Sequence, residues 1–274
     1  MARHPVRALF RCAGFVVVIF CALLEFFFFI RLPGRHKQYH TRAEWLQRCC
    51  RRLLRLLDVR VETSGSPPVQ GLLASNHLSY LDIVVLAALH PMIFVSKAEV
   101  RDWPLIGWMT RCAGTLFINR GQRTDVKRVA AQFAPVIAHG RVVALFPEGT
   151  STNGRIVLPF RPSLLEPAAA NAWPVSPAWI GYALADGRVE DEVCYWRDLS
   201  FGPHLLNLFA KEAITARVAF GVPVPAGLDR KEMARALHVA VCQLAADRGH
   251  ALEDSPAIIA EITRLANAAH ESAN

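Results

Sequence analysis

Between residue 61 and the C-terminus, short apolar runs alternate with stretches of helical character. The runs are 71–75, 92–96, 115–118, 142–146, 175–180 and 216–222. Apolar runs of this length predict buried strands, whereas the longer stretches at 81–90 and 124–139 predict helices, the second ended by Gly140. Strands that alternate with helices are typical of an α/β domain. We therefore predict a mainly parallel or mixed sheet flanked by helices.

The C-terminal part of the chain, from about residue 228, predicts two helices. Asp229 to Arg248 is followed by a glycine that favours a helix end, and Ser255 to Ala269 forms the second helical stretch. A chain of 274 residues is long enough for one sizeable core. We therefore assign residues 61–274 to a single main domain that includes these helices.

The N-terminus carries a long apolar segment, CAGFVVVIFCALLEFFFFI at 12–30, with Glu25 as its one charge. Nineteen residues is about the length that crosses a bilayer. Three arginines precede it, as in a signal peptide, but the apolar run is longer than usual and no small-residue cleavage site follows. We predict that residues 1–35 are an uncleaved membrane anchor, either a single span or a monotopic hairpin.

Residues 36–60 predict a basic amphipathic helix. Within TRAEWLQRCCRRLLRLLD, Trp45, Cys49 and Leu53 recur every fourth residue, with arginines between them. This composition is typical of a helix lying in the membrane interface. A helix that packs on the main domain, with its arginines in solvent, fits the same pattern.

The net charge of +8 is concentrated at the N-terminus. Residues 1–60 hold 12 Lys and Arg against three acidic residues, a net of +9, which leaves about −1 for the remainder. Positive charge beside an apolar segment favours an anionic membrane surface over nucleic acid, which basic residues on the folded domain would indicate. Seven scattered cysteines, with no CxxC pair, predict reduced thiols in a cytosolic compartment and no zinc site.

Several common catalytic motifs are missing from the sequence. It contains no G-x-S-x-G, no G-x-x-x-x-G-K-[ST], no G-x-G-x-x-G and no H-E-x-x-H. Serine-elbow hydrolases, P-loop ATPases and zincins are therefore disfavoured.

The segment ASNHLSYLD, residues 74–82, places His77 five residues before Asp82. On one ideal helix the two side chains would point roughly 140° apart. However, Ser79-x-x-Asp82 predicts a capping box that opens a helix at 80–90, so His77 lies in the preceding turn.

From that turn, the imidazole can fold back toward the carboxylate in the first helical turn. A carboxylate on one ring nitrogen leaves the other nitrogen as a base for a substrate hydroxyl. The simpler alternative is that Asp82 only caps the helix and His77 is an ordinary turn residue.

Two further segments follow predicted strands. FPEGTSTNG at 146–154 places Glu148, Gly149 and Thr150 in a loop at a strand's carboxyl end, the edge at which open α/β sheets bind ligands. We expect this loop to meet the His77 turn, although Pro147 and Gly149 are also ordinary turn residues. GTLFINRG at 114–121 ends in Arg120, which either binds an anionic group or is solvated at the strand end.

These segments together resemble a known family. NHLSYLD, GTLFINR, FPEGTST and WPVSPAWI are similar, in order and spacing, to the four motif blocks of lysophosphatidic acid acyltransferases and related glycerolipid acyltransferases. The resemblance covers roughly residues 70–225. It implies a membrane-bound enzyme that moves an acyl chain from acyl-CoA or acyl-carrier protein to the free hydroxyl of a lysophospholipid, such as lysophosphatidic acid.

The resemblance also implies roles for individual residues. His77 is expected to be the general base and Asp82 its orienting partner, with Arg120, Glu148, Gly149 and, with weaker support, Thr150 binding the acceptor head group. A thioester donor is already activated, so no cofactor and no metal are expected. The expected location is the inner or cytoplasmic membrane, with the active site facing the cytosol.

The sequence departs from the family pattern at Ser151, where many members carry arginine after F-P-E-G-T. A missing cation weakens the case for a phosphate-bearing acceptor, unless Arg155 or Arg161 compensates. The alternative acceptor is lyso-ornithine lipid. A non-catalytic lipid-binding or scaffold protein with the same fold is the more distant alternative.

Overall fold

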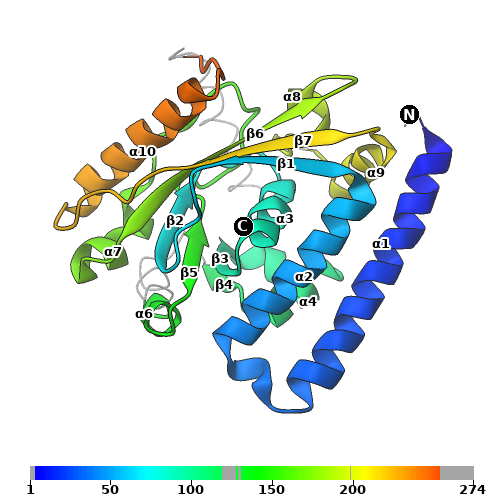
Figure 1. Ribbon diagram of the computed structural model, residues 1–274, viewed down its shortest axis with the longest axis horizontal. Coiled ribbons are helices and arrows are strands. Elements are labelled where there is room, and N and C mark those ends of the chain that lie inside the picture. Colours follow the sequence, from blue (N-terminus) through cyan, green and yellow to red (C-terminus); the bar gives the residue numbers. More distant parts are fainter. Residues whose placement is uncertain (1–3, 119–127, 129–130, 198, 254–274) are drawn as a thin grey trace.

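A computed structural model describes residues 4–118, 128, 131–197 and 199–253. Over these residues the chain forms one sheet of seven strands (Figure 1). The strands are β1 (Val59–Ser64), β2 (Gly71–Ser75), β3 (Met92–Lys97), β4 (Leu116–Ile118), β5 (Val142–Leu145), β6 (Val175–Leu184) and β7 (Ile214–Phe220).

The sheet is mixed, in the order β1-β7-β6-β2-β5-β3-β4. The five strands from β6 to β4 are mutually parallel. β7 runs antiparallel to β6, and β1 pairs with β7 in parallel. The predicted α/β class with a mainly parallel or mixed sheet is confirmed.

The helices and helical turns connect these strands. The longer helices are α1 (Pro5–Phe26), α2 (Tyr39–Leu57), α3 (Tyr80–Leu89), α4 (Ile106–Ala113), α9 (Phe201–Ala210) and α10 (Arg230–Asp247). The shorter elements are η1 (Phe27–Arg31), η2 (Arg35–Lys37), η3 (Ala98–Asp102), α6 (Phe133–Ala138), η4 (Pro162–Leu164), α7 (Glu166–Asn171) and α8 (Val189–Glu192).

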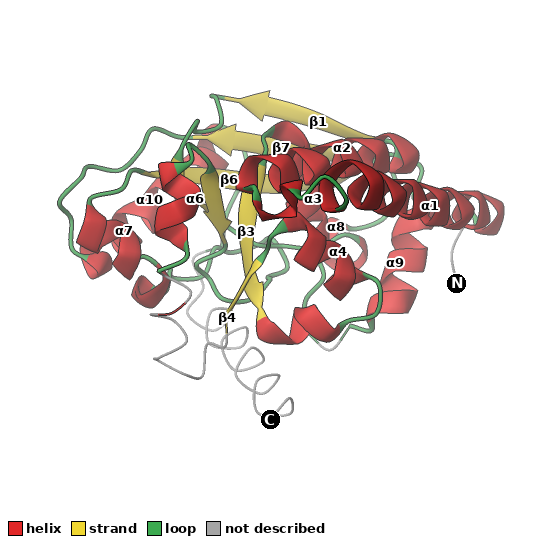
Figure 2. Ribbon diagram, turned by 90° about the horizontal axis from the view of Figure 1, so that it is seen from below, coloured by secondary structure: helices red, strands yellow, loops and turns green. Residues whose placement is uncertain are grey.

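Helices cover both faces of the sheet, as Figure 2 shows. One face packs against α2, α3 and α9, and the other packs against α6, α7 and α10. Because side chains alternate along a strand, neighbouring residues serve opposite cores. In β2, for example, Leu73 faces the first core whereas Leu72 and Ala74 face the second.

The predicted strands are confirmed, with ends shifted by at most four residues, as are the helices at 81–90 and 229–248. The elements β1, α4 and α9 were missed, as were the shorter elements η3, η4, α7 and α8. β1 was missed because the helix predicted at 36–60 was extended over its first two residues. The predicted helix 124–139 is seen only as α6, since most of its first half lies outside the described residues, as does the helix predicted at 255–269.

The N-terminal helix packs on the rest of the molecule. Figure 1 shows α1 lying antiparallel beside α2. The indole Nε1 of Trp45 donates a 2.8 Å hydrogen bond to the Ala22 carbonyl, and Glu25 accepts hydrogen bonds from Arg48 and Arg52 at 2.7 and 2.8 Å. The described part of the segment predicted as an anchor is therefore docked on α2.

At its other end α1 contacts α9. The Arg7 guanidinium donates to the Ala210 carbonyl at 3.3 Å, and Arg11 donates to the carbonyls of Phe209 and Glu212, each at 3.3 Å, and of Lys211. Carbonyls at the end of a helix have no partner within it, and cations are favourable there. The two arginines therefore satisfy the C-terminal end of α9.

The alternative interpretation of α2, a helix that packs on the domain, is confirmed. Trp45, Cys49 and Leu53 are buried between α1 and α4, whereas Leu54 and Leu57 reach the sheet core. α2 ends at Leu57 and β1 begins at Val59, so the predicted boundary after residue 60 falls inside the first strand.

Candidate active site

His77 and Asp82 meet where β2 passes into α3. Asp82 forms the predicted capping box with Ser79 at the start of α3, and the turn before it returns the imidazole to the carboxylate. His77 Nδ1 lies 2.8 Å from Asp82 Oδ2. A carboxylate only accepts, so Nδ1 carries the proton and Nε2 is the basic nitrogen. The expected contact between the two side chains is confirmed.

The Asp82 carboxylate is fully buried and accepts four hydrogen bonds. Besides the His77 ring, Oδ2 accepts the backbone N–H groups of Leu78 and Ser79 at 2.7 and 2.9 Å. Oδ1 accepts the hydroxyl of Tyr182, on β6, at 2.7 Å. These donors offset the cost of burying a charge and fix the direction of the oxygen that holds the imidazole.

The turn that carries His77 is held from two further sides. Asn76 pairs with the backbone of Ile180 on β6, accepting its N–H at 2.8 Å and donating to its carbonyl at 2.9 Å. The imidazole stacks on the ring of Phe146, with centroids 4.1 Å apart and planes 17° apart. The ring plane is therefore defined, while 21% of the His77 side chain stays exposed.

Glu148, in the loop at 146–154, connects this loop to the turn that carries His77. Its Oε1 accepts the backbone N–H of His77 at 2.7 Å, and its Oε2 accepts that of Leu158 at 2.7 Å. The side chain is only 2% exposed. Burial, opposed by these two N–H groups and assisted by the nearby Asp82 carboxylate, raises the pKa of Glu148 to about 8. The expectation that the two loops meet is confirmed, and this contact favours a positioning role. Head-group binding by Glu148 stays a prediction.

Of the remaining predicted residues, two lie in the same loop as Glu148, and the third lies outside the described part of the chain. Gly149 is buried with φ +85°, a conformation that favours glycine, and Thr150 beside it is half-buried. Ser151 donates its hydroxyl to the Tyr195 carbonyl, so this position is neutral and directed inward. Arg120 lies outside the described residues.

Sequence reasoning missed four residues that shape this site. Tyr182 orients Asp82, Asn76 fixes the turn, Phe146 supports the imidazole and the Leu158 N–H holds Glu148. Asn76 and Phe146 lie inside the quoted motifs and could have been found. The other two carry no local signal, because their roles depend on strand order and on the path of a loop.

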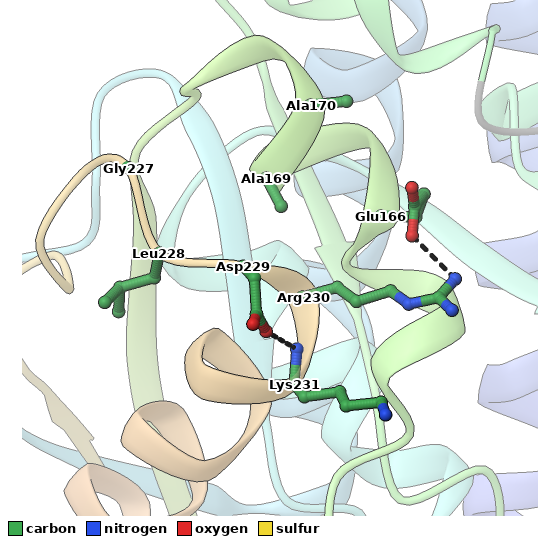
Figure 3. A pocket seen from close by; sticks show the side chains of 8 residues that line it. All are labelled: Glu166, Ala169, Ala170, Gly227, Leu228, Asp229, Arg230 and Lys231. Atoms are coloured by element: carbon green, nitrogen blue, oxygen red, sulfur yellow. Dashed lines mark hydrogen bonds and ion pairs between the residues drawn. The ribbon is translucent and has the colours of Figure 1, made fainter.

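A separate cavity of about 620 Å³ lies between α7 and the start of α10 (Figure 3). Arg230 bridges to Glu166 across it at 2.7 Å, and Asp229 accepts the Lys231 N–H at 2.6 Å as part of a capping box. No residue of the His77 turn or of the loop at 146–154 lines this cavity. It is therefore distinct from the site around His77.

The site around His77 is typical of enzymes in which a histidine, oriented by a buried aspartate, acts as a base. Within the described residues, the His77 ring hydrogen-bonds only to Asp82. The same ring stacks on Phe146. The neighbouring strands β2 and β5 end together in register, with Ala74 opposite Leu145, and bring the two loops to one edge. This is the edge at which α/β sheets form active sites.

Comparison with known proteins identifies the family. The Acyltransferase family model matches residues 58–181. A lyso-ornithine lipid O-acyltransferase of Pseudomonas aeruginosa is 39% identical over 217 residues, which cover 77% of this chain and 81% of the relative. The chain belongs to the acyltransferase family.

Two other similar proteins extend the comparison. A 1-acyl-sn-glycerol-3-phosphate acyltransferase of Neisseria meningitidis is 31% identical over 173 residues, 62% of this chain and 68% of the relative. The crystal structure of the 1-acyl-sn-glycerophosphate acyltransferase PlsC of Thermotoga maritima has the same fold, with a TM-score of 0.65 and 18% identity over 90% of this chain and 96% of that one.

Proposed function

We propose that the protein transfers an acyl chain from a thioester, carried by acyl-CoA or acyl-carrier protein, to the hydroxyl of lyso-ornithine lipid. The observation that carries this proposal is the His77–Asp82 pair, held at 2.8 Å at the sheet edge of an acyltransferase fold. The 39% identity to a lyso-ornithine lipid O-acyltransferase supports the choice of acceptor. Lysophosphatidic acid, the acceptor first expected, is the competing substrate.

In this mechanism His77 acts on the acceptor hydroxyl. Nε2 removes the hydroxyl proton as the oxygen attacks the thioester carbonyl, the new C–O bond forms, and the C–S bond breaks. The imidazolium then returns the proton to the thiolate that leaves. Asp82 keeps Nδ1 protonated and stabilises the imidazolium. The donor is a co-substrate, and the step takes no metal or cofactor.

The choice of acceptor rests on charge near the FPEGT loop. A phosphate monoester needs cations, whereas an ornithine head group carries an ammonium beside its carboxylate and needs fewer. Ser151 replaces the arginine common in the family. Arg155, a candidate substitute for it, is engaged by Glu253, which accepts from its Nε at 2.7 Å. The neutral side chain at 151 and the ion pair of Arg155 both disfavour a dianionic acceptor, and Arg161 is the other candidate cation near this loop.

An acceptor panel tests this assignment. With purified full-length protein and saturating donor, we expect kcat/KM for lyso-ornithine lipid to exceed that for lysophosphatidic acid by at least about 10-fold, the effect of one missing ion contact. Ser151→Arg should narrow this ratio, and Ser151→Ala should leave it unchanged. Equal or faster turnover of lysophosphatidic acid by the wild type would contradict the assignment.

We further propose attachment to the cytosolic face of the inner membrane through the outer face of α1. Within the described part of the chain, Pro5–Arg31 is the one stretch long and apolar enough to cross a membrane. Its exposed large apolar side chains are Val6, Leu9, Phe10, Val16, Val17, Phe20, Leu24, Phe27, Phe28 and Phe29. Those within α1, from Val6 to Leu24, fall on one helix face, opposite the face buried against α2. A docked helix with an apolar outer face favours the monotopic alternative.

Charge on that outer face should release the protein from lipid. Phe10 and Phe20 are 73% and 60% exposed, so aspartate at both positions should leave the fold intact. We expect binding to vesicles of phosphatidylcholine and phosphatidylglycerol to fall at least about 100-fold, because each phenylalanine loses its burial in lipid. Val239→Asp, at a 65% exposed position on α10, is the matched control. Unchanged co-sedimentation of the double variant would rule out this surface.

A further inference from the structure

α10 lies beyond the residues matched by the family model, yet it and the residues after it hold the segment that follows FPEGT. His238 Nε2, on α10, lies 2.9 Å from the Val157 carbonyl oxygen. His250 Nε2 lies 2.8 Å from the Gly154 carbonyl oxygen. A carbonyl oxygen only accepts, so both nitrogens carry their protons and donate.

The contact at His238 is made to a peptide group that also belongs to the site. The carbonyl of Val157 and the N–H of Leu158 are parts of one planar peptide unit, and in a trans peptide they point in opposite directions. Its carbonyl accepts from His238, while its N–H donates to Glu148 Oε2 at 2.7 Å. The peptide plane is therefore held between an imidazole and a carboxyl group.

From Glu148 the connection continues to the base, because its second oxygen accepts the His77 N–H at 2.7 Å. Hydrogen bonds in such a series polarise and orient one another. Each internal group is buried, with Glu148 2%, Val157 6% and Leu158 5% exposed. A buried carbonyl left without its donor costs about 1–3 kcal/mol, and we expect the peptide plane to lower this cost by rotating, which would carry the Leu158 N–H away from Glu148.

We propose that His238 is a positioning residue for acyl transfer: by fixing the 157–158 peptide plane, it sets the Glu148 carboxyl group that holds the turn carrying His77. His238 acts through Glu148 and touches no substrate. This role rests on the proposed function of His77 as the base. The ring of Phe160 packs edge-on against the His238 ring, with ring centroids 5.6 Å apart, and limits the orientations of the imidazole.

The test compares two substitutions at this position in the full-length protein. His238→Leu removes the donor, whereas His238→Gln places an amide N–H at a similar reach. We expect His238→Leu to lower kcat about 10-fold, as for one lost buried hydrogen bond, with both KM values changed less than about 2-fold. His238→Gln should restore kcat to within about 3-fold of wild type, by the same hydrogen bond.

Val241→Ala is the matched control, since Val241 is a fully buried core residue on the same helix and, like Phe160 and Leu237, belongs to the core around α10. It should lower thermal stability while its folded fraction keeps a wild-type kcat. All variants are assayed below the onset of unfolding measured by circular dichroism.

The outcomes separate this role from a structural one and from the mechanism itself. A wild-type kcat in folded His238→Leu, or failure of His238→Gln to restore kcat, would overturn the positioning role while His77→Ala remains inactive. Turnover by His77→Ala would instead overturn the proposed base. Loss of kcat in His238→Leu, its recovery in His238→Gln and normal kcat in Val241→Ala would together support the positioning role.

Discussion

His77→Ala should reduce acyl transfer by at least about 10³-fold, because the acceptor hydroxyl then has no base within reach and general-base catalysis is lost. The side chain is partly exposed and its ring packs on Phe146, so water can fill the space left by the imidazole. The measurement is the initial rate of labelled acyl transfer to lyso-ornithine lipid at saturating donor.

The controls for His77→Ala are its thermal unfolding and its binding to anionic vesicles, both of which should match the wild type. His77 is not part of the exposed apolar face of α1, so we expect its replacement to leave attachment to lipid unchanged. A rate within 10-fold of the wild type, in a preparation free of host acyltransferase, would show that another group removes the proton.

Asp82→Asn should lower kcat by a similar factor, about 10³-fold or more, for a different reason. The carboxylate accepts four hydrogen bonds, and an amide nitrogen cannot accept any of them. With its amide oxygen in the place of Oδ2, the Asn side chain would still accept from the three N–H donors, but its NH2 group would face the Tyr182 hydroxyl, and the neutral amide would no longer supply the charge that stabilises the His77 imidazolium. We expect both a lower kcat and a lower midpoint of thermal unfolding, since a buried donor is left unpaired.

Tyr182→Phe is the graded control for Asp82→Asn. It removes one of the four donors, keeps the ring that packs in the core, and leaves the charge and the contact to the imidazole in place. We expect a loss of kcat of about 10-fold, the effect of one hydrogen bond to a charged group. Equal losses in Asp82→Asn and Tyr182→Phe would mean that the hydroxyl of Tyr182, and not the carboxylate, carries the effect.

Most of the fold could be predicted because its signals are local. The strands of the parallel part are continuous apolar runs, and the capping box at Ser79 and Asp82 is contained in four residues. The same capping box places His77 outside the helix, so the contact between His77 and Asp82 followed from the sequence as well.

One contact at the site could not be predicted, because it depends on pairing between segments that lie far apart in the sequence. Tyr182 lies 100 residues from Asp82, and it reaches the carboxylate only because β6 is the neighbour of β2 in the sheet. Sheet order is a property of the whole chain, so no local pattern reports it. β1, by contrast, alternates apolar and polar residues, which is a local strand pattern, but the helix predicted to extend to residue 60 covered its start.

The arginines of α1 also bear on the order of events during synthesis. Arg7 and Arg11 are made at the start of translation, whereas the carbonyls that they bind, at Phe209 to Glu212, follow about 200 residues later. Chains emerge from the N-terminus at roughly 5–20 residues per second, so α1 waits at least about ten seconds for its partners. In that interval its outer apolar face is open to lipid, whereas α2, which covers the inner face, is made soon after α1. The catalytic domain is therefore completed on a helix that has already had time to find a membrane.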